Sequence, residues 1–380
     1  TVKITKATQF YAVCRKSNYY TVSYYLGNGS TNAAYQKLTQ TVEEGTVVTF
    51  AKVPARTGYV NQGWSSKKNS EKATAKAKCT VNKNITLYAV QKKAVQLTFH
   101  RCDGSTWQKT TLAKGSSYSL PGVRDAEGYT FMGWSTKPMQ SVSPQYEAEE
   151  KITVNGNVDL YAVVFNRTTE TDLTEDQLPQ VDIYKYKQVI FVGDSRTEFM
   201  ENVLTGMGES ATKNVKFVCS AGKGLDWFTT TGWAQLYSIV QHDSNSILSK
   251  KTAVIFNFGV NDLSKSADYA EYYNWIAPQL KSKGCELYFM SVNPVNRLML
   301  PNAGRADRSE AAVRSFNQYM KANLSSAYTY IDMYSYLKST GYSFASDHYG
   351  TGTVDDGLHY TTRTYKRIFA KCMDSLRVPA

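Results

Sequence analysis

Residues 188–196 read Gln-Val-Ile-Phe-Val-Gly-Asp-Ser-Arg, and this stretch decides the fold of the carboxyl-terminal half of the chain. The apolar run Val189–Val192 is typical of a strand that is buried on both faces, as in a parallel sheet. Gly193, Asp194 and Ser195 then favour a turn, because glycine tolerates unusual backbone angles and short polar side chains bond to nearby backbone groups. Two interpretations follow: a simple tight turn, or a serine nucleophile presented at the carboxyl end of a parallel strand.

Beyond this stretch, apolar runs alternate with helical patterns. Five strands are predicted, at Val189–Val192, Val215–Cys219, Ala253–Phe258, Glu286–Ser291 and Tyr328–Asp332. Three helices are predicted, at Asp268–Lys283, Arg305–Leu324 and Thr362–Leu376. This alternation indicates a parallel sheet covered on both faces, so the carboxyl-terminal domain is predicted to have three α/β/α layers around a five-stranded parallel sheet. Functional residues of such sheets gather at the carboxyl ends of the strands.

Chemically useful residues follow three of these strands or precede the last helix. The second strand runs into the glycine-rich loop Ser220–Gly224, the third is followed by Asn261, and Asp356 and His359 come just before the last helix. In acyl transfer, His359 can take the proton of Ser195, while Asp356 orients the imidazole ring and stabilises the imidazolium. The N–H groups of Ser195 and Gly224 and the side-chain amide of Asn261 would supply three donors to an oxyanion.

The four blocks, in this order, resemble the SGNH hydrolases, which are the GDSL-type esterase and lipase superfamily. They are Gly-Asp-Ser195, the loop glycine, Gly-x-Asn261-Asp and Asp356-x-x-His359. The resemblance covers residues 188–380. It implies a flavodoxin-like sheet, ester hydrolysis without a metal or other cofactor, and the catalytic roles given above.

Two positions depart from the family pattern. Arg196 replaces the usual leucine, and Cys219 stands where the second block usually has asparagine. Counting from Cys219 selects Gly224 as the oxyanion donor, with Gly222 as the alternative. Arg196 either fixes the loop by pairing with a carboxylate or faces the pocket and attracts an anionic substrate, and the structural role is slightly favoured.

Three further residues near the motifs are candidates for the site. Trp227 and Tyr360 flank the motifs and are predicted, with Arg196, to line the substrate pocket, although core packing explains the two aromatic residues equally well. His348 is the one alternative to His359 as the catalytic base.

The amino-terminal part of the chain repeats itself. Gly58–Ser65 recurs as Gly128–Ser135, and Ile85–Val90 recurs as Val158–Val163. Short alternating strands between glycine-containing turns predict small β-rich modules. The pattern resembles the Listeria–Bacteroides repeat, or internalin B-type repeat, which implies β-grasp-like modules of secreted bacterial surface proteins.

The complete chain is therefore predicted to be a multidomain protein with two β-grasp-like repeats followed by a flavodoxin-like hydrolase domain. The aromatic residues that recur in the repeats, Tyr59 with Trp64 and Tyr129 with Trp134, are predicted to be core residues. The predicted boundaries are 1–17 for the tail of a truncated upstream repeat, 18–93 and 94–167 for two repeats, 168–187 for a linker and 188–380 for the hydrolase domain.

Charge is distributed unevenly along the 380 residues. The net charge of +12 arises entirely within residues 1–93, which contain 15 Lys and Arg against 3 Asp and Glu. Without a basic helical stripe or a stacking platform, nucleic acid is not the predicted partner; an anionic cell-wall polymer fits this basic segment. The six scattered cysteines disfavour a metal site or a dense disulfide framework. No apolar stretch has membrane-spanning length and no signal peptide is recognised, so membrane insertion is not predicted.

These features predict a secreted or cell-surface serine esterase of bacterial type. Its expected substrates are small acyl esters, above all O-acetyl groups on carbohydrate or cell-wall glycan. One alternative is an O-acyltransferase that uses the same triad. The other is an adhesin whose hydrolase-like domain is idle, which the complete set of catalytic positions disfavours.

Overall fold

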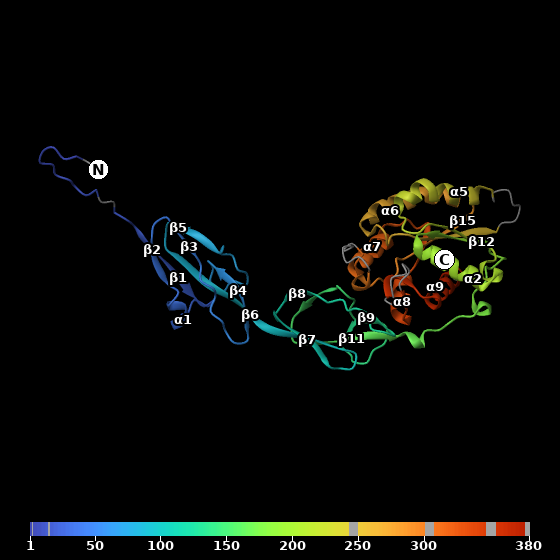
Figure 1. The fold of residues 1–380 in the computed structure, drawn as a ribbon, viewed down its shortest axis with the longest axis horizontal. Helices are drawn as coiled ribbons and strands as arrows, with labels where there is room; N and C mark the ends of the chain where they lie inside the picture. Colours follow the sequence, from blue (N-terminus) through green and yellow to red (C-terminus); the bar gives the residue numbers. More distant parts are fainter. Residues whose placement is uncertain (2, 14–15, 243–249, 301–307, 347–354, 377–380) are drawn as a thin grey trace. The chain divides into compact units, whose positions relative to one another are not determined.

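The computed structural model describes the chain except for residues 2, 14–15, 243–249, 301–307, 347–354 and 377–380 (Figure 1). The chain forms two compact units, which are Thr1–Leu97 with Lys109–Ser117 and Thr153–Val158, and Thr98–Gln108 with Tyr118–Ile152 and Asp159–Ala380. The second repeat thus contributes to both units, and the domain boundaries given above remain predictions. Within the described ranges, no helix combines the length and the apolar character needed to cross a membrane.

The first unit contains the first repeat, a small β-rich module. Its elements are β1 (Tyr19–Tyr25), α1 (Ala33–Gln36), β2 (Gln40–Glu43), β3 (Thr46–Thr49), β4 (Tyr59–Ser65), β5 (Lys78–Val81) and the start of β6 (Ile85–His100). β1 pairs antiparallel with β2 and parallel with β6, and β4 pairs antiparallel with β6. β3 and β5 form a separate antiparallel ribbon. Residues 8–13, within the segment predicted as the tail of an upstream repeat, form no strand and pair with no described strand.

The aromatic residues shared by the two repeats differ in burial. Trp64 and Trp134 are core residues, as predicted, and each indole N–H donates to a backbone carbonyl 13 residues upstream, at 2.6 and 2.8 Å. The prediction is wrong for Tyr59 and Tyr129, which are 37% and 43% exposed. Each tyrosine is the first residue of its strand and directly follows a glycine of positive φ, so it lies at the rim of the module.

The second repeat has the same kind of strands. They are the end of β6 and β7 (Thr106–Ala113), β8 (Ser116–Ser119), β9 (Tyr129–Ser135), β10 (Lys151–Val154) and β11 (Val158–Asn166). Within the second unit, β9 and β11 pair antiparallel around the buried ring of Trp134. The chain then passes through the short helices η1 (Arg167–Thr169) and η2 (Glu175–Gln177). The predicted linker packs closely here, because the Glu170 carboxylate is buried and accepts a hydrogen bond from Arg367 at 3.0 Å.

The rest of the second unit is the hydrolase domain. Its strands are β12 (Tyr186–Gly193), β13 (Val215–Cys219), β14 (Lys251–Asn257), β15 (Cys285–Met290), β16 (Tyr328–Ile331), β17 (Phe344–Ser346) and β18 (Asp355–Tyr360). Its longer helices are α2 (Ser195–Met207), α5 (Trp233–His242), α6 (Ser266–Lys281), α7 (Glu310–Asn323), α8 (Met333–Thr340) and α9 (Thr362–Ser375). The shorter ones are α3 (Glu209–Thr212), α4 (Leu225–Trp227), η3 (Phe228–Gly232), η5 (Leu263–Lys265) and η6 (Arg297–Met299).

Strands β12 to β16 form the predicted five-stranded parallel sheet. Its order, β13-β12-β14-β15-β16, is the flavodoxin-like order 2-1-3-4-5. Alternate residues of each strand belong to different cores: Ile190 and Val192 pack with α5, α6 and α7, whereas Val189 and Phe191 pack with α2, α8 and α9. Helices therefore cover both faces, and the predicted three-layer fold class is confirmed.

A buried charged cluster lies beside α8. The Lys338 ammonium, 5% exposed, lies 2.8 Å from carboxylate oxygens of both Glu147 and Glu310 and donates to the carbonyl of Met132 at 2.7 Å. Burial acts to raise the pKa of the Glu310 carboxyl, but the Lys338 charge together with hydrogen bonds from Lys338, the Val295 N–H and the Tyr334 hydroxyl holds that pKa below its ordinary value. Lys338 thus pairs with the buried Glu310 and the half-buried Glu147, although burial still raises the pKa of the Glu147 carboxyl.

Replacing Lys338 with methionine is expected to lower the free energy of unfolding of the second unit by about 3–5 kcal/mol. Removing one partner of a buried ion pair leaves the other partner charged and unpaired, which costs about this much. Urea unfolding followed by circular dichroism measures the change, with the exposed Lys281→Met on α6 as the control. Equal stabilities of the two variants would contradict a compensating role for Lys338.

Candidate active site

The chain turns sharply from β12 into α2 at Ser195. A Cβ atom on Gly193 would lie 2.0 Å from the hydroxyl of Thr197, so the turn requires glycine. Asp194 caps the helix, because its side chain accepts a hydrogen bond from the Arg196 N–H at 3.0 Å. Ser195 is the first residue of α2, where backbone N–H groups have no partner within the helix. Its N–H can therefore donate to a bound group.

A continuous relay joins Ser195 to β18. The Oγ atom of Ser195 lies 2.9 Å from Nε2 of His359, and Nδ1 of His359 lies 2.6 Å from Oδ2 of Asp356. The other oxygen of Asp356 accepts from the backbone N–H groups of Leu358 and His359 at 2.8 and 2.7 Å. Ser195, His359 and Asp356 are 6%, 3% and 3% exposed. The structure thus brings together the three residues predicted as a triad, in the order that proton transfer requires.

Two neighbours shape the surroundings of the relay. The Asp194 carboxyl is fully buried, and burial raises its pKa to about 6 against the opposing effect of the Arg196 guanidinium. Phe199, one helical turn after Ser195, meets the His359 ring edge-on with ring centres 4.6 Å apart.

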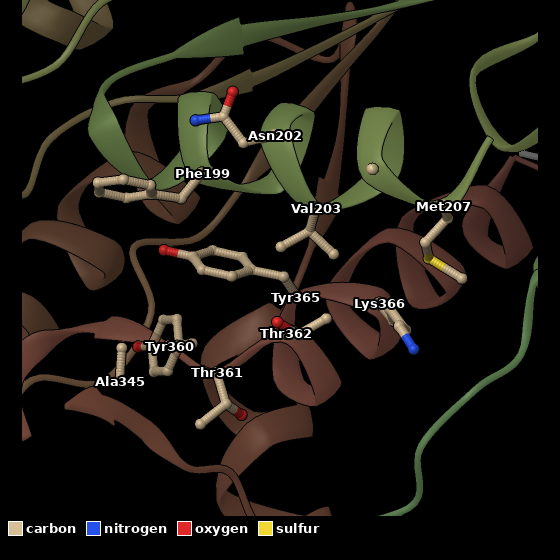
Figure 2. A pocket seen from close by; sticks show the side chains of 11 residues that line it. Phe199, Asn202, Val203, Met207, Ala345, Tyr360, Thr361, Thr362, Tyr365 and Lys366 are labelled. Carbon is tan, nitrogen blue, oxygen red and sulfur yellow. The ribbon is translucent and has the colours of Figure 1, made fainter. Parts of the chain in front are cut away.

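A groove of about 740 Å³ lies between α2 and α9 and extends from Phe199 past Val203 (Figure 2).

The other two oxyanion candidates lie in loops that flank β12. The register pairs Gly193 with Cys219 of β13 and with Asn257 of β14, so the loops after these strands open on either side of the β12 end. This is the point where the strand order reverses, at which open α/β sheets bind ligands. The side-chain amide of Asn261 donates to the carbonyl of Lys223 at 2.8 Å. The loop that holds Gly224 is thereby tied to Asn261.

Gly224 cannot carry a side chain in this conformation. A Cβ atom there would lie 2.4 Å from a carboxylate oxygen of Asp262, which accepts from the Leu225 N–H at 2.9 Å. Asp262 therefore buttresses the loop. Gly222, the alternative donor, has a φ of +70° with open space around it, so a turn explains its glycine without any ligand.

Arg196 lies inside the protein, 2% exposed. Its guanidinium donates to the carbonyls of Leu358, Asn293 and Pro294 at 3.1, 3.0 and 3.0 Å. These contacts favour a structural role for Arg196 over a role in attracting substrate, with backbone carbonyls as its hydrogen-bond partners in place of the predicted carboxylate. Tyr360 is 3% exposed, and its hydroxyl donates to the carbonyl of Pro294, while its side chain also lines the groove between α2 and α9.

Two further residues, Trp227 and His348, were predicted as candidates for the site. Trp227 is half-buried and packs beside Gly232, where a Cβ atom would lie 2.7 Å from its ring. His348 lies outside the residues that the structure describes. Among the described residues, His359 is the histidine within hydrogen-bonding distance of Ser195.

Arg308 is a site residue that the sequence interpretation missed. Its buried guanidinium donates to the side-chain oxygen of Asn261 at 2.5 Å. This contact fixes which end of the Asn261 amide is the nitrogen, and it orients the nitrogen away from Arg308. No spacing motif marks Arg308. It falls within a predicted helix, and a charged side chain there is expected to be exposed to solvent. The structure starts α7 only at Glu310, with Ser309 as its cap.

Replacing Arg308 with methionine is expected to lower kcat by about tenfold with little change in KM. Loss of an oxyanion donor typically costs about 10²–10³ in kcat, and Arg308 affects such a donor only indirectly. Kinetics on p-nitrophenyl acetate measure the effect. Arg308→Met added to Asn261→Ala should cause no further loss, since both changes act on one group. A fully additive double variant would contradict this coupling.

Family models match both parts of the chain. The Listeria–Bacteroides repeat domain matches residues 20–90 and 96–163, and the GDSL-like lipase/acylhydrolase family matches residues 189–372. Residues 189–372 therefore form a hydrolase domain of the GDSL-type SGNH family, and two Listeria–Bacteroides repeats precede it. The protein is an enzyme of the carboxylic ester hydrolase type.

Several solved structures resemble the hydrolase part. An acetyl xylan esterase, AlAXEase, is 10% identical, covers 50% of this chain and 99% of its own, and has a TM-score of 0.35. The catalytic domain of peptidoglycan O-acetyltransferase A from Streptococcus pneumoniae is 16% identical, with coverages of 51% and 94% and a TM-score of 0.31. TesA is 14% identical, with coverages of 50% and 98% and a TM-score of 0.33. The search of curated proteins found no match.

Proposed function

We propose that this protein is a serine esterase that removes small acyl groups, chiefly O-acetyl groups, from carbohydrate or cell-wall glycan. The observation that carries the proposal is the relay from Ser195 Oγ through the His359 imidazole to the Asp356 carboxylate, at 2.9 and 2.6 Å. A serine hydroxyl becomes a nucleophile when a base is within reach and a third group holds that base in place.

The mechanism uses these groups in two half-reactions. His359 Nε2 takes the Ser195 proton as Oγ attacks the ester carbonyl, and the carbonyl oxygen becomes an oxyanion. The intermediate then breaks its bond to the alcohol, which leaves with the proton from His359, and an acyl-serine remains. Water repeats the sequence, giving the carboxylic acid and free Ser195. Asp356 stays ionised and stabilises the imidazolium in both halves.

Oxyanion stabilisation is assigned to three donors. The Ser195 N–H is free of helical bonding, the Gly224 N–H lies at the start of a helical turn, and the Asn261 amide lies beside that loop. Donors fixed in advance stabilise developing charge without reorganisation, which makes them a large part of catalysis.

The proposed substrate and location follow from context. The nearly complete burial of the Ser195 and His359 side chains favours a small acyl group. Repeats of the Listeria–Bacteroides type support a secreted or surface-bound bacterial protein, which would meet glycans outside the cell. Transfer of the acyl group to another hydroxyl, in place of water, is the alternative that the same triad permits.

A substrate screen tests this function. Wild-type protein and Ser195→Ala are incubated with p-nitrophenyl acetate, acetylated xylan and O-acetylated peptidoglycan, and released acetate is measured. Release by the wild type alone supports the esterase. An acylated acceptor formed at the expense of free acetate would identify a transferase. Absence of turnover on every ester, with no fluorophosphonate labelling of Ser195, would overturn the proposal and favour an idle, adhesin-like domain.

The basic amino-terminal segment suggests a second role, which is attachment to an anionic cell-wall polymer. The entire net charge of +12 falls within residues 1–93. Binding of the protein to wall teichoic acid is expected to weaken as NaCl rises from 0.05 to about 0.5 M, because screening shortens the range of surface charges. Sedimentation with purified cell walls measures it. Binding that is absent or insensitive to salt would leave the repeats as spacers.

A further inference from the structure

The chain between β15 and α7 contacts the second repeat. We call its residues 293–300 the bridging loop. The Asn296 side-chain amide donates to the Val123 carbonyl at 3.0 Å and to the Asp125 carboxylate at 2.9 Å. The Asp125 side chain has no exposed surface and also accepts from the Phe131 N–H at 2.9 Å. All these residues belong to the second compact unit, so this contact joins repeat and hydrolase within one body.

A second contact lies one residue further along the bridging loop. The Arg297 guanidinium meets the Glu149 carboxylate through Nε at 3.0 Å and Nη2 at 2.8 Å. The other oxygen of Glu149 accepts from the Ala311 N–H in the first turn of α7 at 3.3 Å. Glu149 is thus held from two directions, and its carboxylate favours the helix start that it contacts.

The same loop also contacts the strand that carries Asp356 and His359. The Asn296 N–H donates to the Gly357 carbonyl at 2.8 Å. Gly357 has a φ of +67°, and a Cβ atom on it would lie 2.4 Å from the Asn296 carbonyl oxygen. This close approach requires glycine between the two relay residues.

On its other side, the bridging loop contacts the residue after Ser195. Arg196 donates to the carbonyls of Asn293 and Pro294 in the loop and to Leu358 in β18. One loop therefore connects the start of α2, strand β18 and the second repeat. The first repeat could not replace the second here, because Ala55 occupies the position that corresponds to Asp125.

We propose that the second repeat is a functional part of the hydrolase site. Val123, Asp125 and Glu149 hold the bridging loop, and the loop holds Asp356 and His359 within reach of Ser195. Asp125, Glu149, Asn296 and Arg297 are positioning residues. The catalytic consequence rests on the proposed esterase function, whereas the structural coupling does not.

A charge swap in the full-length chain tests the proposal. Glu149→Arg and Arg297→Glu each place like charges together, and the double variant restores an opposite pair. Asn296→Ala removes the neighbouring contact without changing charge. The matched control is Asp159→Asn, which removes a carboxylate that is hydrogen-bonded to His100 in the same repeat. Two readouts are taken: kcat and KM on p-nitrophenyl acetate, and hydrogen–deuterium exchange of the peptide covering 355–360.

Each single charge variant, and Asn296→Ala, should lower kcat by about tenfold with KM changed less than about twofold, because small misplacement of catalytic groups costs rate. Exchange in 355–360 should rise in parallel. The double charge variant should recover both readouts to within about threefold, and Asp159→Asn should match the wild type.

Two results would overturn the proposal. The first is that hydrogen–deuterium exchange and kcat are both unchanged in the single variants. The second is that the double charge variant has a kcat as low as that of each single charge variant. If the wild type hydrolyses no ester, the proposed function fails by itself, and the exchange readout still decides whether the second repeat holds β18.

Discussion

Ser195→Ala is expected to lower kcat on p-nitrophenyl acetate by about 10⁶-fold, the scale of removing the nucleophile from a serine hydrolase triad. The methyl group cannot form the acyl intermediate, so only water attack aided by the oxyanion donors remains. KM should change little, since Oγ contributes to bond formation and hardly to binding. Stopped-flow and long-time assays together cover this range, and fluorophosphonate labelling at residue 195 should disappear.

The control for this variant is Ser282→Ala. The Ser282 hydroxyl is exposed, at the end of α6, and donates to the Gln279 carbonyl. This variant should keep wild-type kcat and labelling. If Ser195→Ala retained more than about a tenth of the activity, another nucleophile would have to carry the reaction, and the assignment of Ser195 would fall.

The strands of the hydrolase domain were predictable because burial on both faces leaves a simple pattern. Val215–Cys219 was predicted with its observed bounds, and the strand predicted as Glu286–Ser291 is shifted by one residue from β15. Continuous apolar runs of this length have few other interpretations. The strand order was implied only by the family resemblance, because the connectivity rules also permit other orders for such a sheet.

Helix α2 was not predicted, for a physical reason. It starts at Ser195, its first three residues are polar yet buried, and it therefore lacks a clean apolar stripe. A helix stabilised by tertiary packing of polar residues does not show the periodicity by which helices are recognised. The sequence predicted that Ser195 follows a strand but did not predict the helix that begins at this residue.

The contacts of Arg196, Arg308 and Asn296 were also beyond the reach of the sequence. Arg196 donates to carbonyl groups, which every residue possesses, so no side-chain pattern encodes these bonds. Arg308 and Asn296 pair with residues 47 and 171 positions away in the chain. Motifs record short spacings, whereas these contacts depend on how distant segments fold together.

Asp356→Asn is expected to lower kcat by about 10⁴-fold while leaving the fold intact, as the equivalent change does in a serine protease triad. The asparagine oxygen can still accept from the N–H groups of Leu358 and His359, so the turn in β18 is preserved. Its NH₂ group faces Nδ1 of His359, however, and cannot accept a proton from it. The imidazole then carries its proton on Nε2, where it cannot take the proton of Ser195.

Two further measurements distinguish loss of the relay from misfolding of the variant. Asp268→Asn, an exposed change at the start of α6, is the control and should leave kcat unchanged. The thermal midpoint of Asp356→Asn should stay within about 4–8 °C of the wild type, a shift that corresponds to about 1 kcal/mol in a small domain. Combining Asp356→Asn with Ser195→Ala should cost no more than Ser195→Ala alone, because a relay without its nucleophile has nothing left to activate. A double variant slower by the product of both effects would mean that Asp356 acts independently of Ser195, and the relay would not be the unit of catalysis.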